Sequence, residues 1–414
     1  MKILSISNKD IWPGGENKGI PSIFFAQREF AARGYAVHFL CPLKENTTKR
    51  SLTASINIYR FDFPFNFKKN AYFQTDNILK KLRASILYRL NRLFFQIFSL
   101  YWGIRLAHRI KPDLVYVHSL TPAFLGWFIS RLFKAKLVVR VYGIKDLYWR
   151  RGDILYRIKE VRSHAVFKIP ADYFIITNDG TNGYELARKL GVSEDRIRNW
   201  RNGIDPDLYQ QDLSAKEYVC NYLKLSPSCK IIVSTCRLIP IYGVSRLLYA
   251  FADLSRNNPD AVFLIAGGGP QRQQLEAIAK EAGISSRVFF LGVVDRQMVK
   301  KILYASDIFV LLARYHNCTN TMWEAMACGK CIVTTETQAI KEILTSEKDA
   351  ILVPHDRLDN TASILRELLN DDDLRSRLGD NARKRAKDIL EPWGKRMEKE
   401  ARLLEDVIRN KRSI

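Results

Sequence analysis

The stretch that decides the fold is residues 314–330, RYHNCTNTMWEAMACGK. An apolar run at 308–312 precedes it, and a second apolar run at 331–335 follows it. This order predicts a buried strand, a polar loop, a short helix over 321–328 that ends at Gly329, and another buried strand. A strand, a polar loop and a helix start form an anion site, because the first-turn N–H groups lack partners and the helix dipole is positive there.

The residues around the start of this helix are candidates for binding a ligand. Backbone N–H groups of four residues are expected to face a bound anion: Thr319, Asn320, Thr321 and Met322. Glu324 is the one acid of the helix, and its position predicts hydrogen bonds to hydroxyl groups of the ligand. Cys328 and Cys331 form a Cys-x-x-Cys pattern, but at the end of the helix the dipole disfavours a thiolate, so we expect them to serve packing.

This segment resembles the retaining glycosyltransferases of family 4, which have the GT-B fold. Their signature is Glu-x7-Glu followed by Ala-Met-Ala-x-Gly, and residues 324–329, EAMACG, match its second half. The first glutamate of the signature falls at His316, and no acid occurs between Asp307 and Glu324. The resemblance implies an α/β protein with two Rossmann-like domains that face each other across a cleft. It also implies sugar transfer from a nucleotide donor with retention at the anomeric carbon, with His316 and Glu324 at the catalytic site.

Two further segments of the C-terminal half resemble the same family. Residues 236–244, CRLIPIYGV, are similar to its Gly-Arg-Leu-x-x-x-Lys-Gly, which implies that Arg237 neutralises the donor diphosphate. Tyr242 replaces the family's lysine; it can donate a hydrogen bond but brings no charge. Residues 262–270 contain the family's Gly-x-Gly-Pro, which implies that Gly267 and Gly269 lie beside the nucleotide.

The N-terminal half opens with a pattern typical of a doubly wound sheet. A buried strand at 2–7, a glycine-containing loop and a helix at 22–33 are predicted in that order. Gly14 and Gly15 lie in the loop and would let the backbone approach a ligand closely. The resemblance implies that this ligand is a phosphate of the donor or the acceptor. His118 ends another predicted strand, and the resemblance implies that it faces the donor sugar, at the edge of the sheet where ligands bind.

The length and composition of the chain predict a two-domain globular protein. A chain of 414 residues, 47% of them hydrophobic, can bury two full cores. The resemblance implies an acceptor-side domain at 1–208, a nucleotide-sugar-binding domain at 209–385, and a helical segment at 386–414 that crosses back to the first domain. No cofactor is expected, the donor is predicted to be a UDP- or GDP-sugar, and no His/Cys/acid cluster has the spacing of a zinc site.

Positive charge is the outlier of the composition, with a formal net charge of +23. Residues 77–112 hold eight Lys/Arg and no acid, interleaved with aromatic residues. This pattern is typical of a packed helix with a solvated basic face, or of a helix that lies on an anionic membrane. An acidic substrate and a basic surface without a special partner are further interpretations of the charge. No nucleic-acid-binding motif accompanies the charge, so we expect no nucleic acid partner.

The remaining sequence features concern location and alternative functions. No secretory signal or membrane span is predicted, and seven scattered cysteines indicate a reducing compartment, so we expect a cytoplasmic protein. The basic segment favours a peripheral position on the inner face of the membrane, and with the resemblance it implies a glycan or lipid-linked acceptor. Because His316 and Tyr242 depart from the family, a catalytically silent GT-B subunit that binds a partner protein is one alternative. An epimerase or phosphorylase on the same fold is another. Retention of Arg237 and Glu324 favours an enzyme.

Overall fold

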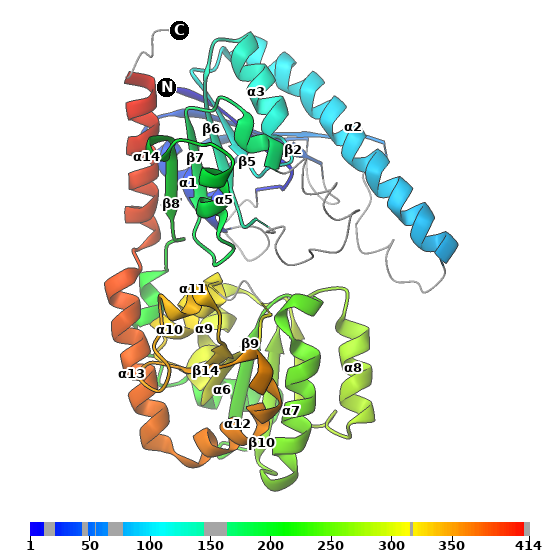
Figure 1. The fold of residues 1–414 in the computed structure, drawn as a ribbon, viewed down its shortest axis with the longest axis vertical. Helices are drawn as coiled ribbons and strands as arrows, with labels where there is room; N and C mark the ends of the chain where they lie inside the picture. Colours follow the sequence, from blue (N-terminus) through cyan, green and yellow to red (C-terminus); the bar gives the residue numbers. More distant parts are fainter. Residues whose placement is uncertain are drawn as a thin grey trace. The chain divides into compact units, whose positions relative to one another are not determined.

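The computed structural model describes residues 1–11, 21–43, 49–53, 55–64, 78–144, 164–314 and 318–409. The chain forms two compact units (Figure 1). The first contains Met1–Asn178, Asn182–Gly203 and Trp393–Ile414, and the second contains Asp179–Thr181 and Ile204–Pro392. The sequence predicted the corresponding boundaries after residues 208 and 385. The chain passes from the first unit to the second after Gly203 and returns after Pro392. These two passages lie side by side, because Ile204 and Pro392 form a parallel bridge and the Ile204 N–H donates to the carbonyl of Glu391 at 2.9 Å.

The first unit is built on a largely parallel sheet. Its strands are β1 (Lys2–Ser7), β2 (Ala36–Pro42), β3 (Arg50–Thr53), β4 (Ile56–Phe61), β5 (Leu114–His118), β6 (Lys136–Val141), β7 (Tyr173–Thr177) and β8 (Ile197–Trp200). They lie in the order β3-β4-β2-β1-β5-β6-β7-β8, and the β3–β4 pair is antiparallel. The strand order reverses between β1 and β5, which pair in parallel with Ser7 opposite His118. The carboxyl ends of these two strands therefore mark the position where a doubly wound sheet binds its ligand.

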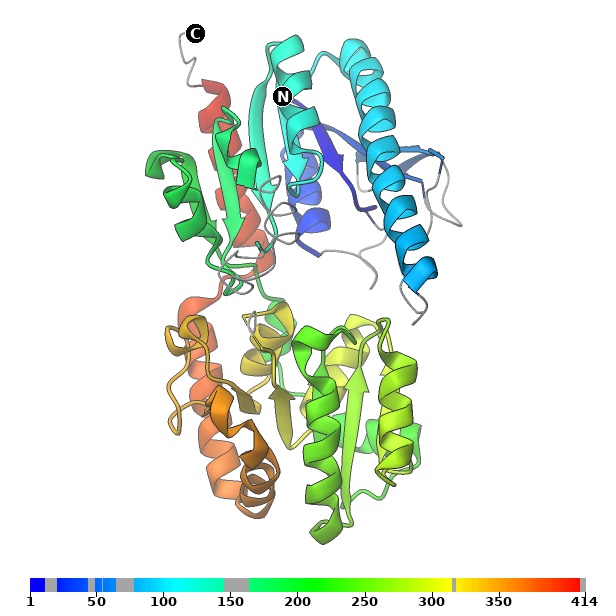
Figure 2. The same cartoon turned by 45° about the vertical axis from the view of Figure 1, so that its right-hand side comes forward.

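Helices cover both faces of this sheet. They are α1 (Pro21–Ala32), α2 (Ile78–Ile110), α3 (Ala123–Leu132), α5 (Gly183–Lys189) and α14 (Trp393–Arg409), with short 3-10 turns η3 (Val166–Lys168) and η4 (Glu194–Arg196). Side chains alternate across the strands, so Val115 and Val117 pack towards α2 and α3, whereas Leu114 and Tyr116 pack towards α1 and α14. Figure 2 shows α2 and α3 side by side on the same face of the sheet.

The second unit has an entirely parallel sheet. Its strands are β9 (Lys230–Thr235), β10 (Ala261–Ala266), β11 (Val288–Gly292), β12 (Ile308–Leu311), β13 (Cys331–Thr335) and β14 (Ile351–Val353), in the order β11-β10-β9-β12-β13-β14. The α-helices are α6 (Ala215–Leu223), α7 (Val244–Asn257), α8 (Arg272–Glu281), α9 (Arg296–Ala305), α10 (Asn320–Ala327), α11 (Gln338–Lys341), α12 (Thr361–Asn370) and α13 (Asp372–Ile389). The 3-10 turns are η5 (Pro206–Tyr209), η6 (Pro240–Tyr242) and η7 (His355–Asn360).

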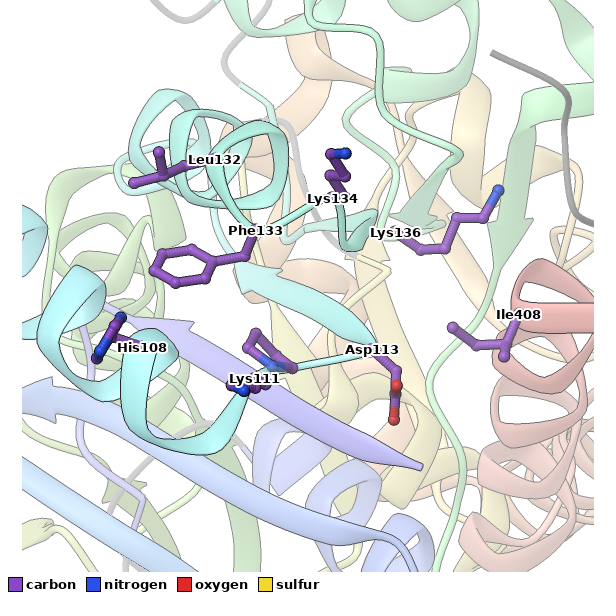
Figure 3. Close-up of a pocket in the computed structure, with 9 residues that line it drawn as sticks. His108, Lys111, Asp113, Leu132, Phe133, Lys134, Lys136 and Ile408 are labelled. Carbon is purple, nitrogen blue, oxygen red and sulfur yellow. The ribbon is translucent and has the colours of Figure 1, made fainter.

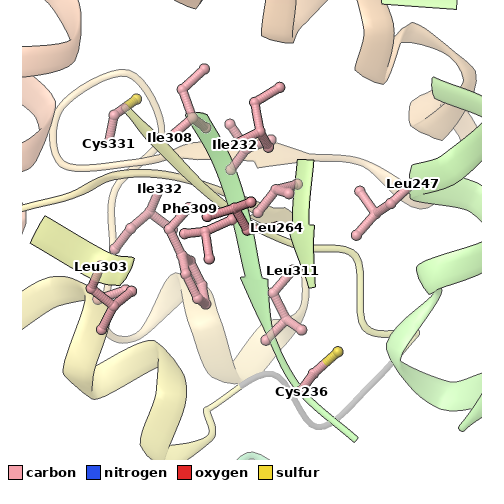
Figure 4. Packing of buried hydrophobic residues seen from close by; sticks show 14 of the residues in the cluster. Ile232, Cys236, Leu247, Leu264, Leu303, Ile308, Phe309, Leu311, Cys331 and Ile332 are labelled. Carbon is pink, nitrogen blue, oxygen red and sulfur yellow. The ribbon is translucent and has the colours of Figure 1, made fainter. Parts of the chain in front are cut away.

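The core of the second unit explains why its central strands read as unbroken apolar runs. All residues of β10, β12 and β13 are buried, because helices cover both faces of a parallel sheet. Figure 4 shows part of this packing, with Leu264, Phe309 and Leu311 between Leu247 and Leu303. The rigid strands bring their carboxyl ends to one edge, where the candidate site lies.

Two details of the helices differ from the predictions. The helix predicted at 321–328 begins at Asn320, because the Thr319 hydroxyl caps it. The helical C-terminus consists of two helices, α13 and α14, since Leu390 has an extended backbone and Pro392 cannot continue a helical hydrogen-bond ladder. The Cys-x-x-Cys pair is buried with both thiols free, in agreement with a packing role.

A buried ion cluster fastens α14 to the sheet of the first unit. The carboxylate of Glu400 on α14 pairs with Arg140 on β6 and with Arg396 on its own helix, the latter at 2.9 Å. It also accepts a hydrogen bond from the hydroxyl of Tyr116 on β5. All of these side chains are buried. Burial favours the neutral form of Glu400, but Arg140 and Arg396 outweigh it and lower the pKa of this carboxyl group, so the carboxylate stays ionised.

We predict that Glu400→Gln destabilises the first unit by about 3–5 kcal/mol, because it leaves Arg140 and Arg396 as uncompensated buried charges. Urea unfolding followed by fluorescence measures the change. Glu398→Gln is the matched control on the same helix: Glu398 forms partly exposed ion pairs with Arg33 and Arg402, which contribute less than about 1 kcal/mol. Equal losses for the two variants would contradict the importance of the buried cluster.

Candidate functional site

The candidate site of the second unit lies at the carboxyl edge of its sheet. The strand order reverses between β9 and β12, and ligands of doubly wound folds bind at such a point. Arg237 follows β9, Gly267 and Gly269 follow β10, and Thr319 precedes α10 after β12. Because these segments leave neighbouring parallel strands at the same edge, the structure brings together the predicted residues of this unit.

Close backbone contacts hold the loop after β9 against the loop after β10. Gly267 has a φ of 144°, and a Cβ at this position would lie 1.8 Å from the carbonyl oxygen of Cys236. A Cβ at Gly269 would lie 2.3 Å from the carbonyl oxygen of Leu238. Both positions therefore require glycine. The two glycines predicted beside the nucleotide also fix the loop that carries Arg237.

Tyr242 orients the side chain of Arg237 at this edge. Tyr242 ends the 3-10 turn η6, and its side chain is buried. The Nη2 atom of Arg237 lies 3.4 Å from the hydroxyl oxygen of Tyr242, and the guanidinium carbon lies 5.7 Å from the centre of its ring. Arg237 itself is exposed. The tyrosine at the family's lysine position thus supplies an orienting group, whereas Arg237 supplies a positive charge open to a ligand.

The N-terminus of α10 is capped by Thr319. Its hydroxyl oxygen accepts a hydrogen bond from the Met322 N–H at 3.4 Å and lies 2.9 Å from the hydroxyl oxygen of Thr321. The first turn contains no acid, so no side chain within it offsets the positive end of the helix dipole. The N–H of Met322, which the sequence predicted to face an anion, is engaged by the cap. The N–H groups of Asn320 and Thr321 precede it in the first turn.

Glu324 lies one turn inside α10 and is partly buried. Burial raises the pKa of its carboxyl group to about 7, and Asp205 adds to this rise while Arg296 opposes it. The carboxyl group is therefore close to half-ionised at neutral pH. A carboxylate at this position, beside a helix start, is suited to accept hydrogen bonds from two neighbouring hydroxyl groups.

We predict that affinity for a nucleoside diphosphate rises as pH rises from 6 to 8, because ionisation of Glu324 creates the acceptor for ribose hydroxyl groups. Glu324→Gln should weaken binding by roughly 1–3 kcal/mol at pH 8 and remove the part of the pH dependence that comes from ionisation of this carboxyl group. Titration calorimetry with UDP and GDP at each pH measures both effects. Glu281→Gln, at an exposed acid on α8, is the control and should leave the profile unchanged. An unchanged profile in Glu324→Gln would remove Glu324 from nucleotide binding.

In the first unit, His118 lies at the carboxyl end of β5 within a chain of buried hydrogen bonds. The side-chain oxygen of Gln27 accepts from the Ser5 hydroxyl at 2.5 Å, so the amide nitrogen of Gln27 faces the Nε2 atom of His118 at 3.0 Å. This arrangement makes Nε2 the acceptor and assigns the ring proton to Nδ1. The Nδ1–H then donates to the hydroxyl oxygen of Tyr142 at 2.8 Å.

This environment keeps His118 neutral and inward-facing. Burial, together with the positive charge of Arg140, lowers the pKa of the imidazole to about 3, although Glu400 opposes this shift. His118 is fully buried with both ring nitrogens engaged, whereas Tyr142 is only half-buried. Of these four hydrogen-bonded residues, Tyr142 is thus the one whose side chain reaches the surface. Sequence reasoning missed it as a site residue, although its place directly after a predicted strand was a signal. A contact between His118 and a donor sugar stays a prediction.

Three predicted site residues, Gly14, Gly15 and His316, lie outside the described residues. Within the described ranges, no group of His, Cys, Asp and Glu side chains is arranged to hold a metal ion. Among the same residues, no helix has the length and apolar composition to cross a membrane.

A pocket of about 660 Å³ lies at the opposite, amino-terminal edge of the first unit's sheet. Figure 3 shows Lys111, Lys134 and Lys136 around it, with Asp113 between the strands and Ile408 on α14. Lys111 and Lys134 follow the C-terminal ends of α2 and α3, where cations offset the negative ends of helix dipoles. The basic lining therefore has a structural explanation, and the pocket is separate from the edge where His118 lies.

Comparisons with known proteins agree for both halves of the chain. Residues 26–208 match the family model described as Glycosyltransferase Family 4, and residues 223–385 match that of Glycosyl transferases group 1. Alpha-D-kanosaminyltransferase of Streptomyces kanamyceticus is 24% identical over 295 residues, which cover 69% of this chain and 76% of that protein. The chain is a glycosyltransferase of the family 4 type.

Solved structures show that this glycosyltransferase has the GT-B fold. Sucrose-phosphate synthase of Thermosynechococcus elongatus superposes with a TM-score of 0.75 at 16% identity, covering 99% of this chain and 100% of that one. HepE of Anabaena, solved in complex with UDP-glucose, gives a TM-score of 0.71 at 15% identity, covering 98% and 99%. The predicted fold class is confirmed. The enzyme transfers a sugar from a nucleotide-sugar donor to an acceptor.

Proposed function

We propose that this glycosyltransferase uses a UDP- or GDP-sugar without a metal ion and retains the configuration at the anomeric carbon. The acceptor is a glycan or a lipid-linked sugar of the cell envelope. The observation that carries the donor proposal is the convergence of Arg237, the first turn of α10 and Glu324 at the switch point of the second unit's sheet. HepE, which shares the fold, is described in complex with UDP-glucose.

In this proposal each group of the second unit has a separate role. Arg237 and the N–H groups of Asn320 and Thr321 hold the diphosphate, and Glu324 accepts hydrogen bonds from the ribose. Negative charge builds up on the diphosphate as the sugar departs. Preorganised donors stabilise such charge by about 3 kcal/mol each. Tyr242 contributes by holding the guanidinium of Arg237 in place rather than by adding charge.

In this proposal His316 contacts the reacting sugar, and His118 of the first unit is a further predicted contact. Relative to the family, Tyr242 removes one positive charge and His316 removes one negative charge, so the formal charge of the site is unchanged while His316 is neutral. Protonated His316 adds a positive charge that partly replaces the lysine beside the leaving diphosphate. We therefore expect turnover to fall as pH rises through the pKa of His316.

The donor proposal predicts that UDP or GDP binds equally well with and without a chelator. Arg237→Gln should weaken this binding about 10- to 150-fold, since hydrogen bonds between charged groups contribute about 1.5–3 kcal/mol. Calorimetry measures the effect of the chelator and the effect of the Arg237 variant on affinity. Mass spectrometry of products from a panel of nucleotide sugars identifies the donor. Arg256→Gln, at an exposed arginine of α7, is the control. Strict dependence on Mg²⁺ or Mn²⁺ would overturn the metal-free mechanism.

A silent GT-B subunit that binds a partner protein is the second candidate function, because His316 and Tyr242 stand where the family has glutamate and lysine. The double variant Tyr242→Lys/His316→Glu restores the family pattern and separates the two candidates. If the natural chain is an active enzyme adapted to its donor, the double variant should lose activity. If the natural chain is silent, the double variant should gain activity from none, and the enzyme proposal would be wrong. Product formation by both chains with the same donor panel is the measurement.

A further inference from the structure

The outer faces of α2 and α3 expose most of the large apolar side chains found on the described surface. Eight of fourteen lie there, with exposed fractions from 38% at Trp102 to 55% at Tyr101 and Leu132. They are Ile86, Leu93, Ile97, Tyr101 and Trp102 on α2, and Phe124, Phe128 and Leu132 on α3. Single apolar residues are normal on a surface, whereas a concentration on two neighbouring helices marks an interaction site.

Helical spacing arranges these side chains in two stripes. On α2, Ile86 and Leu93 are seven residues apart, and Ile97 and Tyr101 follow at intervals of four, so they share one side of the helix. On α3, Phe124, Phe128 and Leu132 repeat every four residues. Both helices bury their opposite sides against the same face of the sheet (Figure 1). The two stripes therefore face away from the sheet on the same side.

Tight packing joins the two helices into one surface. Gly103 of α2 lies against Ile129 of α3, where a Cβ on the glycine would be 2.6 Å from the Ile129 Cδ1. The side-chain amide of Gln96 on α2 donates to the carbonyl of Thr121, just before α3, at 2.5 Å. We call the exposed side of this pair, from Arg83 to Leu132, the α2/α3 face.

The charges around the stripes are almost all positive. Residues 78–132, from the start of α2 to the end of α3, include nine Lys/Arg, and Asp113 is the only acid among them. Five exposed arginines lie on the two helices: Arg83, Arg89, Arg105, Arg109 and Arg131. Arg105 bonds the Tyr101 hydroxyl at 3.1 Å and lies over the ring of Trp102 at 5.8 Å, so its guanidinium is held beside the apolar stripe. The face thus pairs apolar and cationic groups along its whole length.

The combination of apolar and cationic side chains on this face favours a membrane surface over a second copy of the chain as the partner. A second copy of the chain would bring the same arginines face to face, and like charges would oppose the contact. A bilayer with anionic phospholipids offers phosphate groups to the arginines and an acyl boundary to the apolar side chains. We propose that the α2/α3 face docks the protein on a membrane surface that contains anionic phospholipid.

Docking of this kind is independent of the donor chemistry proposed above. It also narrows the acceptor class: the unit predicted to hold the acceptor would sit on the bilayer, where a lipid-linked acceptor is anchored. This last step rests on the proposed function, whereas the docking itself does not.

Flotation with vesicles of phosphatidylglycerol and phosphatidylcholine, compared with phosphatidylcholine alone, tests the proposal. The protein should float with the anionic vesicles and be released by raised salt. Each arginine near an anionic surface is worth roughly fivefold in partition, so Arg83→Gln/Arg89→Gln/Arg105→Gln should lose about a hundredfold. Ile97→Gln/Phe128→Gln removes one apolar side chain from each helix and should also reduce binding at low salt. Urea unfolding confirms that each variant is folded.

Matched controls carry the same changes elsewhere. Lys224→Gln/Lys280→Gln/Lys395→Gln removes three exposed charges outside the face, and Leu213→Gln removes an apolar side chain that is 84% exposed, more than any other large apolar side chain on the described surface. Both should float like the natural chain. Equal binding to neutral vesicles, or equal losses in the control variants, would overturn the proposal. So would a dimer in sedimentation that Ile97→Gln/Phe128→Gln converts to a monomer while no vesicle binding is seen, since a second copy would then occupy the face.

Discussion

The geometry of the donor side depends on one constraint, the close approach of the loop after β9 to the loops on either side of it. A Cβ at Gly267 or Gly269 would overlap backbone carbonyls of this loop, and a Cβ at Gly243, with a φ of 67°, would lie 2.4 Å from the carbonyl oxygen of Leu312. Three glycines thus allow the loop after β9 to pack closely between the loop after β10 and the end of β12. Without this packing, Arg237 and Tyr242 would not be held at the edge where α10 begins.

The carboxyl edge of the second unit's sheet carries positive charge that no neighbouring acid of the first helical turn neutralises. Arg237 is exposed and oriented by Tyr242, and the first turn of α10 has no acid to offset the dipole. Glu324 is the nearby acid, yet burial raises its pKa to about 7. At neutral pH the edge is therefore on balance positive, as the binding of a diphosphate requires, while the carboxyl group can ionise once hydroxyl groups bond to it.

The first unit differs, because the polar groups around His118 bond to one another and Ser5, Gln27 and His118 are fully buried. Glu400 joins α14 to the sheet through Arg140 and Tyr116, and Arg140 in turn lies 5.3 Å from the ring centre of Tyr142. Tyr142 receives the hydrogen bond from His118. The ion cluster that attaches the last helix therefore also fixes the surroundings of the histidine at the carboxyl end of β5. In contrast, the charges of the α2/α3 face have apolar neighbours instead of acids.

The sequence by itself determined the strands, the two-domain α/β fold and the family, because apolar periodicity and segments such as residues 324–329 are local signals. It also placed Arg237, Gly267, Gly269 and Glu324 at one sheet edge, since parallel strands end together. Only the tertiary structure decided that Tyr242 orients Arg237, that Thr319 engages the Met322 N–H, and that His118 is turned inward between Gln27 and Tyr142. It alone joined the stripe of α3 to that of α2. Arg237 and Tyr242, like Thr319 and Met322, are near neighbours in the chain, but the orientation of their side chains depends on burial and packing. The hydrogen bonds of His118 and the joining of α2 to α3 depend on contacts between residues far apart in the chain, which no local pattern encodes.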